Sequence, residues 1–293
     1  MAARILQIIL PVLAIVAGGW LFGRVARPEI ASVNQMNMDV FVPALILGAL
    51  SRRDFDLWGS RGLILGAVGV VLGSGLLAWP LARWIKVDPR TFVPPMMFNN
   101  SGNLGLPLAV LAFGEEFLPA AVALFATSNL LHFTLGTSIV RGDAHFGSFL
   151  RSPMVLATAG GVLLSATGIG LPGFAGVAVR LAGDVAVPLM IFTLGVRMAT
   201  TPLGVWRIGL AGGIARPVAG LAAALPLGAA LGLSGARLGL LYLFASLPPA
   251  ILNFMVAERY RQEPDRVASI VLIGHLASLV FVPLGLALAL RVG

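Results

Sequence analysis

Long apolar runs follow one another along the whole chain, with only short connections between them. Of the 293 residues, 58% are hydrophobic and 11% are charged, whereas a typical soluble domain is about half apolar and about a quarter charged. A helix needs about 20 largely apolar residues to cross a bilayer, and several runs reach that length. They lack the alternating polarity of membrane β-strands. The sequence therefore predicts an all-α polytopic membrane protein.

Ten membrane spans are predicted from these runs. The first could pass for a signal peptide because Arg4 precedes it, but its length and the lack of a cleavage motif favour a span. The predicted spans cover residues 5–23, 33–50, 62–82, 91–113, 118–140, 153–170, 175–197, 204–231, 236–257 and 266–290.

The connections differ in their content of basic residues. Those after spans 1, 3, 5, 7 and 9 hold twelve Lys and Arg, whereas the other connections and the chain ends hold six. Because cytoplasmic loops carry the excess, both termini are predicted on the non-cytoplasmic side of the membrane. Loop arginines at the lipid bilayer also explain the net charge of +8 without a nucleic-acid partner. The chain has no cysteine for metal ligation, and no metal or cofactor is expected.

Two similar segments indicate an internal repeat. "MDVFVPALILGAL" in the second span resembles "GDVAVPLMIFTLG" in the seventh, where Asp39 matches Asp184 at an offset of 145. The same offset relates Ser101 to Ser246, in two further spans where polar residues interrupt an apolar run. A fixed offset shared by two separate features predicts two related halves.

The halves are predicted as residues 1–145 and 146–293, with five spans each. Because five is odd, the second half must enter the membrane inverted relative to the first. Inverted repeats with a broken helix at the matching place in each half are typical of secondary transporters. The broken crossing helices are predicted to be the fourth and ninth spans.

The polar stretch "FNNSGNLGLPL" interrupts the fourth span, and "SLPPAILN" interrupts the ninth. A break in hydrocarbon exposes backbone groups, so it persists only where it faces protein or a water-filled cavity. Pro107 has no N–H to donate to the carbonyl of Asn103, and the positive ends of half-helices attract anions. The predicted substrate-binding residues are Asn99, Asn100, Ser101, Asn103, Pro107, Ser246, Pro248, Pro249 and Asn253.

Several of these motifs resemble one family. "NNSGNLGLPL" followed by "FGEE", with "ERY…PDRVASIVL…HLASLVFVP" near the end, resembles the auxin efflux carrier family in its bacterial malate- and malonate-permease-like branch. The resemblance covers essentially the whole chain. It implies a secondary active carrier of a small organic anion, and it implies that Asn103 and Pro107 line a carboxylate site.

The resemblance also implies a division of labour among the spans. Spans 1, 2, 6 and 7 would form a scaffold that often dimerises. Spans 3–5 and 8–10 would form a transport domain that moves by an elevator mechanism. The expected partners are the anion, the bilayer, a second copy of the chain and H⁺.

Five ionisable residues fall inside predicted spans, where charges are costly and usually functional. Asp39, Asp184, Arg216, His132 and His275 are therefore candidates for coupling or for substrate charge. Each also has a structural explanation: the aspartates could accept bonds from backbone freed by nearby prolines, and each histidine could bond a neighbouring carbonyl. The predicted driving force is the proton gradient or the membrane potential.

Two other functions are compatible with parts of the sequence. A sodium-coupled symporter of the bile-acid type would share this architecture, but "SLPPAILN" offers no acid as a sodium ligand. An intramembrane aspartyl protease would use Asp39 and Asp184. However, Leu181 stands where that family needs glycine, and "PAL" lies on the same span as Asp39. The sequence therefore predicts a carrier and not an enzyme.

Overall fold

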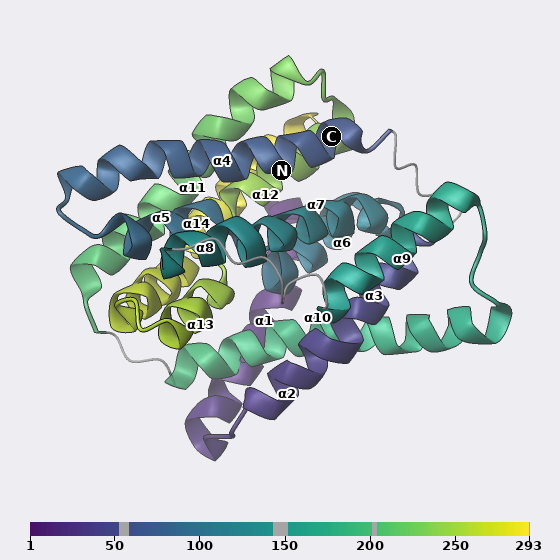
Figure 1. Cartoon of the computed structure of the whole chain (residues 1–293), viewed down its shortest axis with the longest axis horizontal. Coiled ribbons are helices and arrows are strands. Elements are labelled where there is room, and N and C mark those ends of the chain that lie inside the picture. The colour runs from purple at the N-terminus through teal and green to yellow at the C-terminus, as the bar shows by residue number, and fades with distance from the viewer. Residues whose placement is uncertain (53–58, 143–151, 201–203, 293) are drawn as a thin grey trace.

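The computed structural model describes residues 1–52, 59–142, 152–200 and 204–292. Within these ranges the regular elements are helices (Figure 1). Most are α-helical, while η1, η2 and η4 are π-helical and η3 is a 3-10 turn. They are α1 (Ala2–Ala26), α2 (Ala31–Met36), η1 (Asn37–Phe41), α3 (Val42–Leu50), α4 (Arg61–Trp84), α5 (Pro89–Met97), η2 (Ser101–Gly105), α6 (Leu106–Phe113), η3 (Glu115–Phe117), α7 (Leu118–Leu131), η4 (His132–Gly136), α8 (Thr137–Arg141), α9 (Pro153–Thr167), α10 (Gly173–Thr200), α11 (Trp206–Ala230), α12 (Gly235–Ser246), α13 (Ile251–Arg259) and α14 (Pro264–Val292).

Seven helical segments are long and apolar enough to cross a membrane by length and composition. Two shorter apolar helices, Ser101–Phe113 and Pro153–Thr167, accompany them. The prediction of an all-α, multi-pass membrane protein is confirmed. The count of ten spans and their inversion stay predictions.

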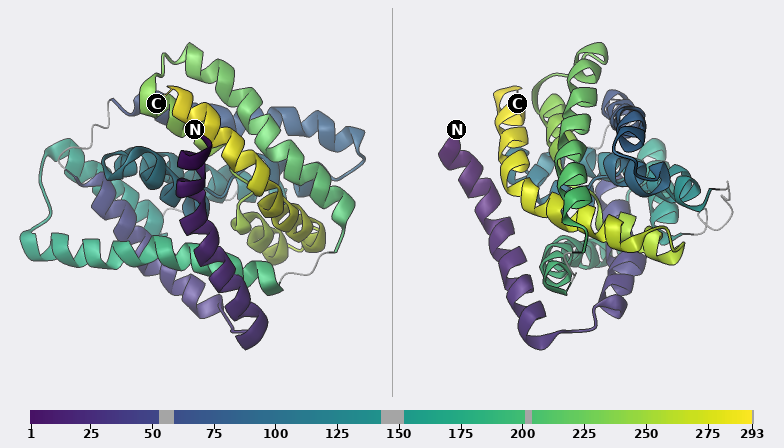
Figure 2. Two further views of the ribbon diagram at one scale, coloured as in Figure 1. Left: turned by 180° about the vertical axis from the view of Figure 1, so that it is seen from behind. Right: turned by 90° about the vertical axis from the view of Figure 1, so that its left-hand side faces the viewer.

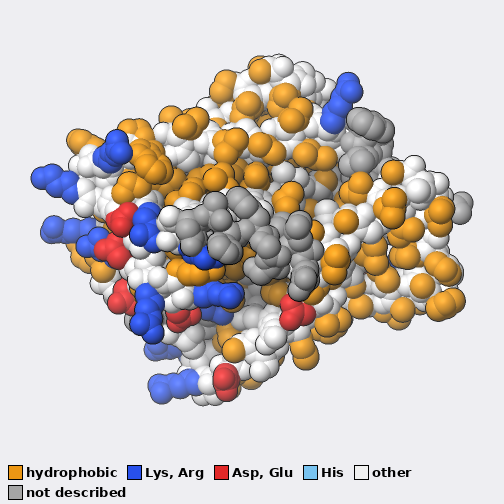
Figure 3. All heavy atoms as spheres, viewed as in Figure 1, with side chains coloured by type: hydrophobic (Ala, Val, Ile, Leu, Met, Phe, Trp, Pro, Cys, Tyr) orange, Lys and Arg blue, Asp and Glu red, His pale blue; other side chains and the backbone are white. Residues whose placement is uncertain are grey.

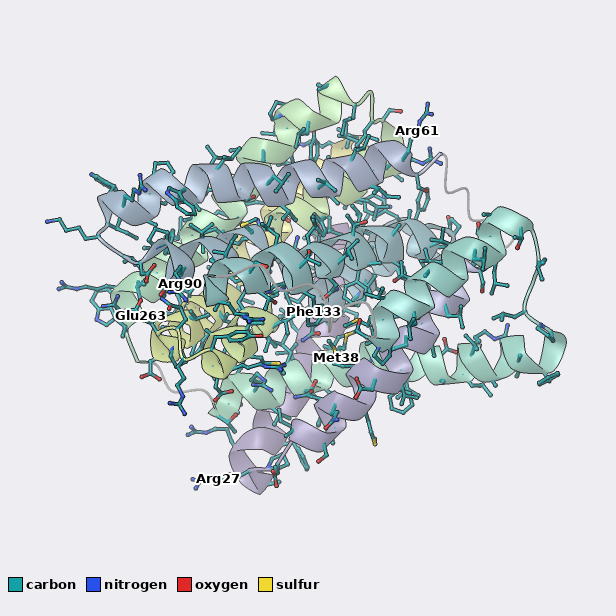
Figure 4. The ribbon with its side chains drawn as sticks, in the orientation of Figure 1. Arg27, Met38, Arg61, Arg90, Phe133 and Glu263 are labelled. Carbon is teal, nitrogen blue, oxygen red and sulfur yellow. The ribbon has the colours of Figure 1, made fainter. Side chains whose placement is uncertain are left out.

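Charged side chains gather at one end of the molecule, beside a broad hydrophobic surface (Figure 3). Arg90 and Glu263 lie close together at that end, whereas Arg61 lies at the opposite end (Figure 4). Thr91, next to Arg90, donates a hydrogen bond of 2.6 Å to the Glu263 carboxylate. The charged end therefore joins the start of α5 to the turn between α13 and α14.

The helices pack in two groups. In one group α1 packs across α10, and α3 packs against both α9 and α10 (Figures 1 and 2). In the other group α11 packs against α4, α12 and α14, and α5 packs against α4. Helix α7 and the segment η2 contact both groups. The main hydrophobic core runs through both groups.

Glycines let helices of the first group approach closely. A Cβ atom at Gly19 would meet the Phe192 carbonyl oxygen, and one at Gly195 would meet the Val16 carbonyl oxygen. Where α9 meets α3, a Cβ at Gly161 would lie 2.8 Å from the Leu50 Cβ. At the offset of 145, Val16 corresponds to Gly161 and Leu50 to Gly195. The contact of Gly195 with Val16 therefore corresponds to the contact of Gly161 with Leu50. Small residues at helix contacts are the usual means of close packing in membranes.

Replacing Gly19 by valine is expected to destabilise the protein, because the added side chain would meet the backbone of α10. Overpacking of this kind costs about 1–3 kcal/mol, and backbone moves less readily than a side chain. Thermal unfolding of the purified protein would measure the loss as a Tm lower by several degrees. Gly18→Val is the control, because a Cβ there meets nothing within 4 Å. Equal Tm values for the two variants would contradict the close approach.

Candidate functional site

Two interruptions of helical structure cross each other inside the protein. The chain leaves helical conformation at residues 98–100, between α5 and η2, and at 247–250, between α12 and α13. The N–H of Asn100 donates to the Pro248 carbonyl (2.8 Å), and the N–H of Ala250 donates to the Phe98 carbonyl (2.9 Å). Asn99 and Pro249 face each other as an antiparallel bridge. Each break therefore satisfies backbone groups that the other exposes. We call this arrangement the crossing.

The two bonds of the crossing are related by an offset of 150. Phe98 corresponds to Pro248 and Asn100 to Ala250 at this offset. The bond from the Asn100 N–H to the Pro248 carbonyl therefore corresponds to the bond from the Ala250 N–H to the Phe98 carbonyl. The same offset relates Asn103 to Asn253. The pairing of Ser101 with Ser246 expected from the offset of 145 therefore does not hold at the crossing. The later half has five more residues between its first span pair and its break than the earlier half.

The first break also lies earlier than predicted. The polar stretch was expected to break the helix between Asn99 and Pro107, but helical structure resumes at Ser101 and continues through η2 into α6. Pro107 lies in the first turn of α6, and the π-helical η2 before it accommodates its missing N–H. The second break falls where Pro248 and Pro249 predicted it.

The end of α12 is capped by three side chains. The main-chain oxygens of residues 243–245 accept, in order, the hydroxyl of Ser246 (2.8 Å), the amide of Asn99 (2.5 Å) and the guanidinium of Arg216 (3.4 Å). The last carbonyls of a helix lack partners within it. Asn99 and Ser246 are both predicted to bind substrate, but here each donates a hydrogen bond to the end of α12.

A chain of hydrogen bonds links Asn100 to α14. His275 contacts the Val271 carbonyl through Nδ1 (2.7 Å) and the Asn100 amide nitrogen through Nε2 (2.7 Å). The Asn100 amide oxygen accepts the N–H of Asn103 (3.3 Å), which fixes the orientation of the amide. Because a carbonyl only accepts and an NH₂ group only donates, His275 must carry its proton on Nδ1 and be neutral.

The two asparagines related by the offset of 150 have different surroundings. Asn253 is 2% exposed, and its Nδ2 donates to the carbonyls of Phe98 (3.1 Å) and Ala250 (3.0 Å). Asn103 is half-buried, and its side chain has no hydrogen bond to any described residue. Asn253 therefore ties the crossing together, while the amide of Asn103 is available to a solute.

Several buried polar atoms near the crossing lack partners among the described residues. They include Oδ1 of Asn99, Oδ1 of Asn253, and Nε and Nη2 of Arg216. Buried polar groups are almost always hydrogen-bonded. Unpaired donors and acceptors at one place are therefore suited to a polar ligand or to water.

Small cavities flank the crossing on two sides. One of about 20 Å³ lies between α10 and the pair α13 and α14, where Arg197, Ile251 and His275 line it. Another of about 10 Å³ is lined by Ser101, Leu247 and neighbours from α6, α7 and α12. Each has room for about one water molecule. A larger solute would enter either of them only if helices moved apart.

The other predicted ionisable residues fall into two sets. The His132 ring stacks on the ring of Phe98, with centroids 4.1 Å apart, so it borders the crossing. Asp39 on η1 and Asp184 on α10 instead have exposed side chains with no bond to a described residue. Their helix faces point away from the core, so neither aspartate is buried within a single copy of the chain.

Sequence reasoning missed the main-chain partners at the site. Phe98 accepts two hydrogen bonds through its carbonyl and stacks its ring on His132. Pro248 contributes its carbonyl as well as its break in the helix. Side-chain type carries no signal for a carbonyl acceptor, although the Pro94–Pro95 pair just before Phe98 does predict that a helix ends nearby.

Fold and site together define a multi-pass helical membrane protein with a polar crossing in its interior. Comparison with known protein sequences identifies the class of membrane protein. A sequence model of the family described as "Membrane transport protein" matches residues 147–286.

Relatives extend this match to the whole chain. A Methanothermobacter thermautotrophicus protein named "Uncharacterized transporter" is 28% identical, over 95% of this chain and 96% of its own length. A Rhizobium meliloti protein named "Putative malonate transporter" is 25% identical, over 99% and 97%. An Arabidopsis thaliana protein named "Auxin efflux carrier component 6" is 24% identical, over 58% of this chain and 29% of its own. The resemblance to the auxin efflux carrier family is confirmed: the chain is a membrane transporter and not an enzyme.

Replacing Asn253 by alanine is expected to lower stability, because two hydrogen bonds at the crossing are lost. Hydrogen bonds inside membrane proteins contribute about 0.6 kcal/mol each on average, so a loss of about 1 kcal/mol is expected. Asn103→Ala is the matched control, because its side chain bonds no described residue. Thermal unfolding should lower the Tm of the first variant only. A larger loss in Asn103→Ala would contradict the division of roles.

Proposed function

We propose that the protein is a secondary active carrier of a small organic anion, most simply a carboxylate. The observation that supports this best is the crossing, where unpaired polar atoms and the amide of Asn103 meet in an apolar molecule. Broken helices that cross near the middle of the membrane are the typical solute sites of secondary transporters. The names of the Rhizobium and Arabidopsis relatives, which refer to malonate and auxin, point to organic acids.

The crossing has the electrostatics of an anion site. The half-helices that begin at Ser101 and Ile251 present their N-terminal ends there, and such ends carry partial positive charge. The guanidinium of Arg216 lies at the adjacent end of α12. The site residues Asn99–Asn103 and Ser246–Asn253 include no carboxylate that would repel an anion.

We further propose ten spans in two inverted halves, residues 1–145 and 146–293, with both termini outside the bacterial inner membrane. Two observations support this. The offset of 145 relates the contact of α1 with α10 to that of α9 with α3, and the offset of 150 exchanges the bonds of the crossing. The start of α1 and the end of α14 also lie near each other (Figure 2).

The transport cycle would move one group of helices against the other. The scaffold would be α1, α2, η1, α3, α9 and α10, and the remaining helices would carry the crossing past it. A Cβ at Gly102 would lie 3.3 Å from the Met190 sulfur of α10, so the crossing abuts the scaffold at small and flexible side chains. An elevator motion of this kind would open the small cavities in turn.

Coupling to the proton gradient or to the membrane potential fits the site better than coupling to sodium. His275 and His132 border the crossing, and imidazole is the side chain most often used to take up and release a proton. A sodium ion prefers carboxylate and carbonyl oxygens, and the crossing supplies no carboxylate. A sodium-coupled symporter of the bile-acid type is the alternative that the experiments below separate.

The exposed aspartates support a homodimer through the scaffold. Asp184 lies near the middle of α10, where a charged side chain facing lipid would be costly. The same helix exposes Phe174 (83%) and Leu181 (64%), which are large apolar residues two turns apart on one face. A second copy of the chain against this face would cover both the charge and the apolar surface.

Leu181→Arg is expected to dissociate the dimer, because it places a large charged side chain in the proposed contact in addition to Asp184. The mass of the purified protein, measured by light scattering with the detergent subtracted, should fall from two chains to one. Leu225→Arg is the control, because Leu225 is also exposed (47%) but lies on α11, outside the scaffold. A monomeric parent protein, or a variant that stays dimeric, would contradict this interface.

Asn103→Ala is expected to abolish uptake in proteoliposomes while the protein stays folded, because the free amide is lost. Asn103→Asp should be at least as severe, since it places a negative charge where the anion binds. Asn34→Ala on α2 is the control and should keep normal uptake. Uptake at the parent rate by a folded Asn103→Ala protein would refute the site.

A thermal-shift screen would identify the solute. A ligand that binds the folded state raises the free energy of unfolding by mass action, by about 2.7 kcal/mol when its concentration is a hundred times its Kd. The Tm rises with it. Malonate and other small mono- and dicarboxylates should be compared with and without Na⁺. A shift that is independent of Na⁺ and absent in Asn103→Ala supports the proposal, whereas a shift only with Na⁺ supports the sodium symporter.

A further inference from the structure

Arg216 is a completely buried cation at the edge of the crossing. Its side chain on α11 is 0% exposed, and its one hydrogen bond within the described part of the chain runs from Nη1 to the Ala245 carbonyl at 3.4 Å. Nε and Nη2 have no partner among the described residues. The neighbouring carbonyl, that of Phe244, binds Asn99 of the opposite break. The guanidinium therefore lies one residue along α12 from the crossing.

No acid lies along the middle of the helices that pack against α11, which are α4, α5, α12 and α14. In their described residues the neutral His275 and Tyr242 are the ionisable groups away from the helix ends, and the charged groups lie toward those ends. Those end residues are Arg61 and Arg83 on α4, Arg90 on α5, Arg237 on α12, and Asp265, Arg266 and Arg291 on α14. The charge of Arg216 is thus not balanced by a neighbouring carboxylate.

An unbalanced buried charge is strongly destabilising, and in membrane proteins such residues are usually functional. Nε and Nη2 lie on one edge of the guanidinium, and their N–H bonds run parallel. This edge matches the two oxygens of a carboxylate in a bidentate pair. The atoms without partners are therefore those that would bind a carboxylate.

We infer that the free edge of Arg216 binds the carboxylate of the solute, and that its single positive charge makes the protein select monoanions. This rests on the proposed function and narrows the substrate class. The loaded crossing is electrically neutral with one carboxylate, because the other site side chains are amides, hydroxyls and prolines. A dicarboxylate binds with its second acid group protonated.

The test compares malonate with malonamate, in which an amide replaces one acid group. Binding to the purified full-length protein is measured by calorimetry at several pH values above the second ionisation of malonic acid. Malonate affinity is expected to fall about tenfold per pH unit, as the monoanion fraction falls. Malonamate stays a monoanion, and its affinity should be constant. It also controls for ionisation of the protein.

Two substitutions at Arg216 separate charge from packing. Arg216→Gln should weaken binding of both compounds at least tenfold, and its unliganded Tm should equal or exceed that of the parent, because an unbalanced buried charge is removed. Arg216→Lys should bind more weakly but keep the pH dependence, since charge is retained and bidentate geometry is lost. Arg83→Gln, an exposed residue at the end of α4, is the control.

The outcomes distinguish this inference from the proposed function. Malonate binding that is constant with pH, or tighter at high pH, overturns the monoanion inference and leaves the anion carrier intact. Parent-like affinity in Arg216→Gln does the same. A lower unliganded Tm with unchanged affinity would make Arg216 a structural residue. If neither compound binds at any pH but another class of solute does, the carboxylate function fails and the inference fails with it.

Discussion

Two backbone hydrogen bonds between the interrupted helices are the interaction on which the rest of the structure depends. An unpaired N–H or C=O group costs several kcal/mol in hydrocarbon. The bond from Asn100 to Pro248 and the bond from Ala250 to Phe98 remove that cost for both breaks together. Without the other, each break would leave these backbone groups without their partners. The two halves of the chain are therefore held in a fixed position at the crossing.

This constraint explains how the polar side chains divide. Asn99 and Ser246 cap the end of α12, Asn253 binds the exposed carbonyls of Phe98 and Ala250, and Asn100 links to His275. These groups stabilise an irregular backbone. The polar atoms without a partner in the described residues include the amide of Asn103, Oδ1 of Asn99 and of Asn253, and two nitrogens of Arg216, and such atoms are suited to a solute or to water. In this protein some residues of the polar cluster stabilise the backbone, and others are available for binding.

Much of this could be predicted from residue type alone. Apolar length predicts the membrane helices, and Pro248 with Pro249 places the second break. The sequence places the first break too late. The π-helical η2 accommodates the missing N–H of Pro107, so helical structure continues from η2 into α6. The sequence places Asp39 and Asp184 within spans but does not give the direction of their helix faces, which point away from the core. The repeat offset at the crossing differed by five residues, because insertions between spans shift register without changing composition.

The sequence by itself determined that this chain crosses a membrane several times, that its helices are interrupted at polar stretches, and that it is related to the auxin efflux carriers. These properties follow from hydropathy, proline and motif, which are local. Only the tertiary structure decided which asparagine holds the frame and which is free, and that Arg216 reaches the crossing without an acid beside it. Those properties depend on contacts between different helices, at separations of 29 positions for Arg216 with Ala245 and 155 for Asn253 with Phe98, and no local pattern encodes them.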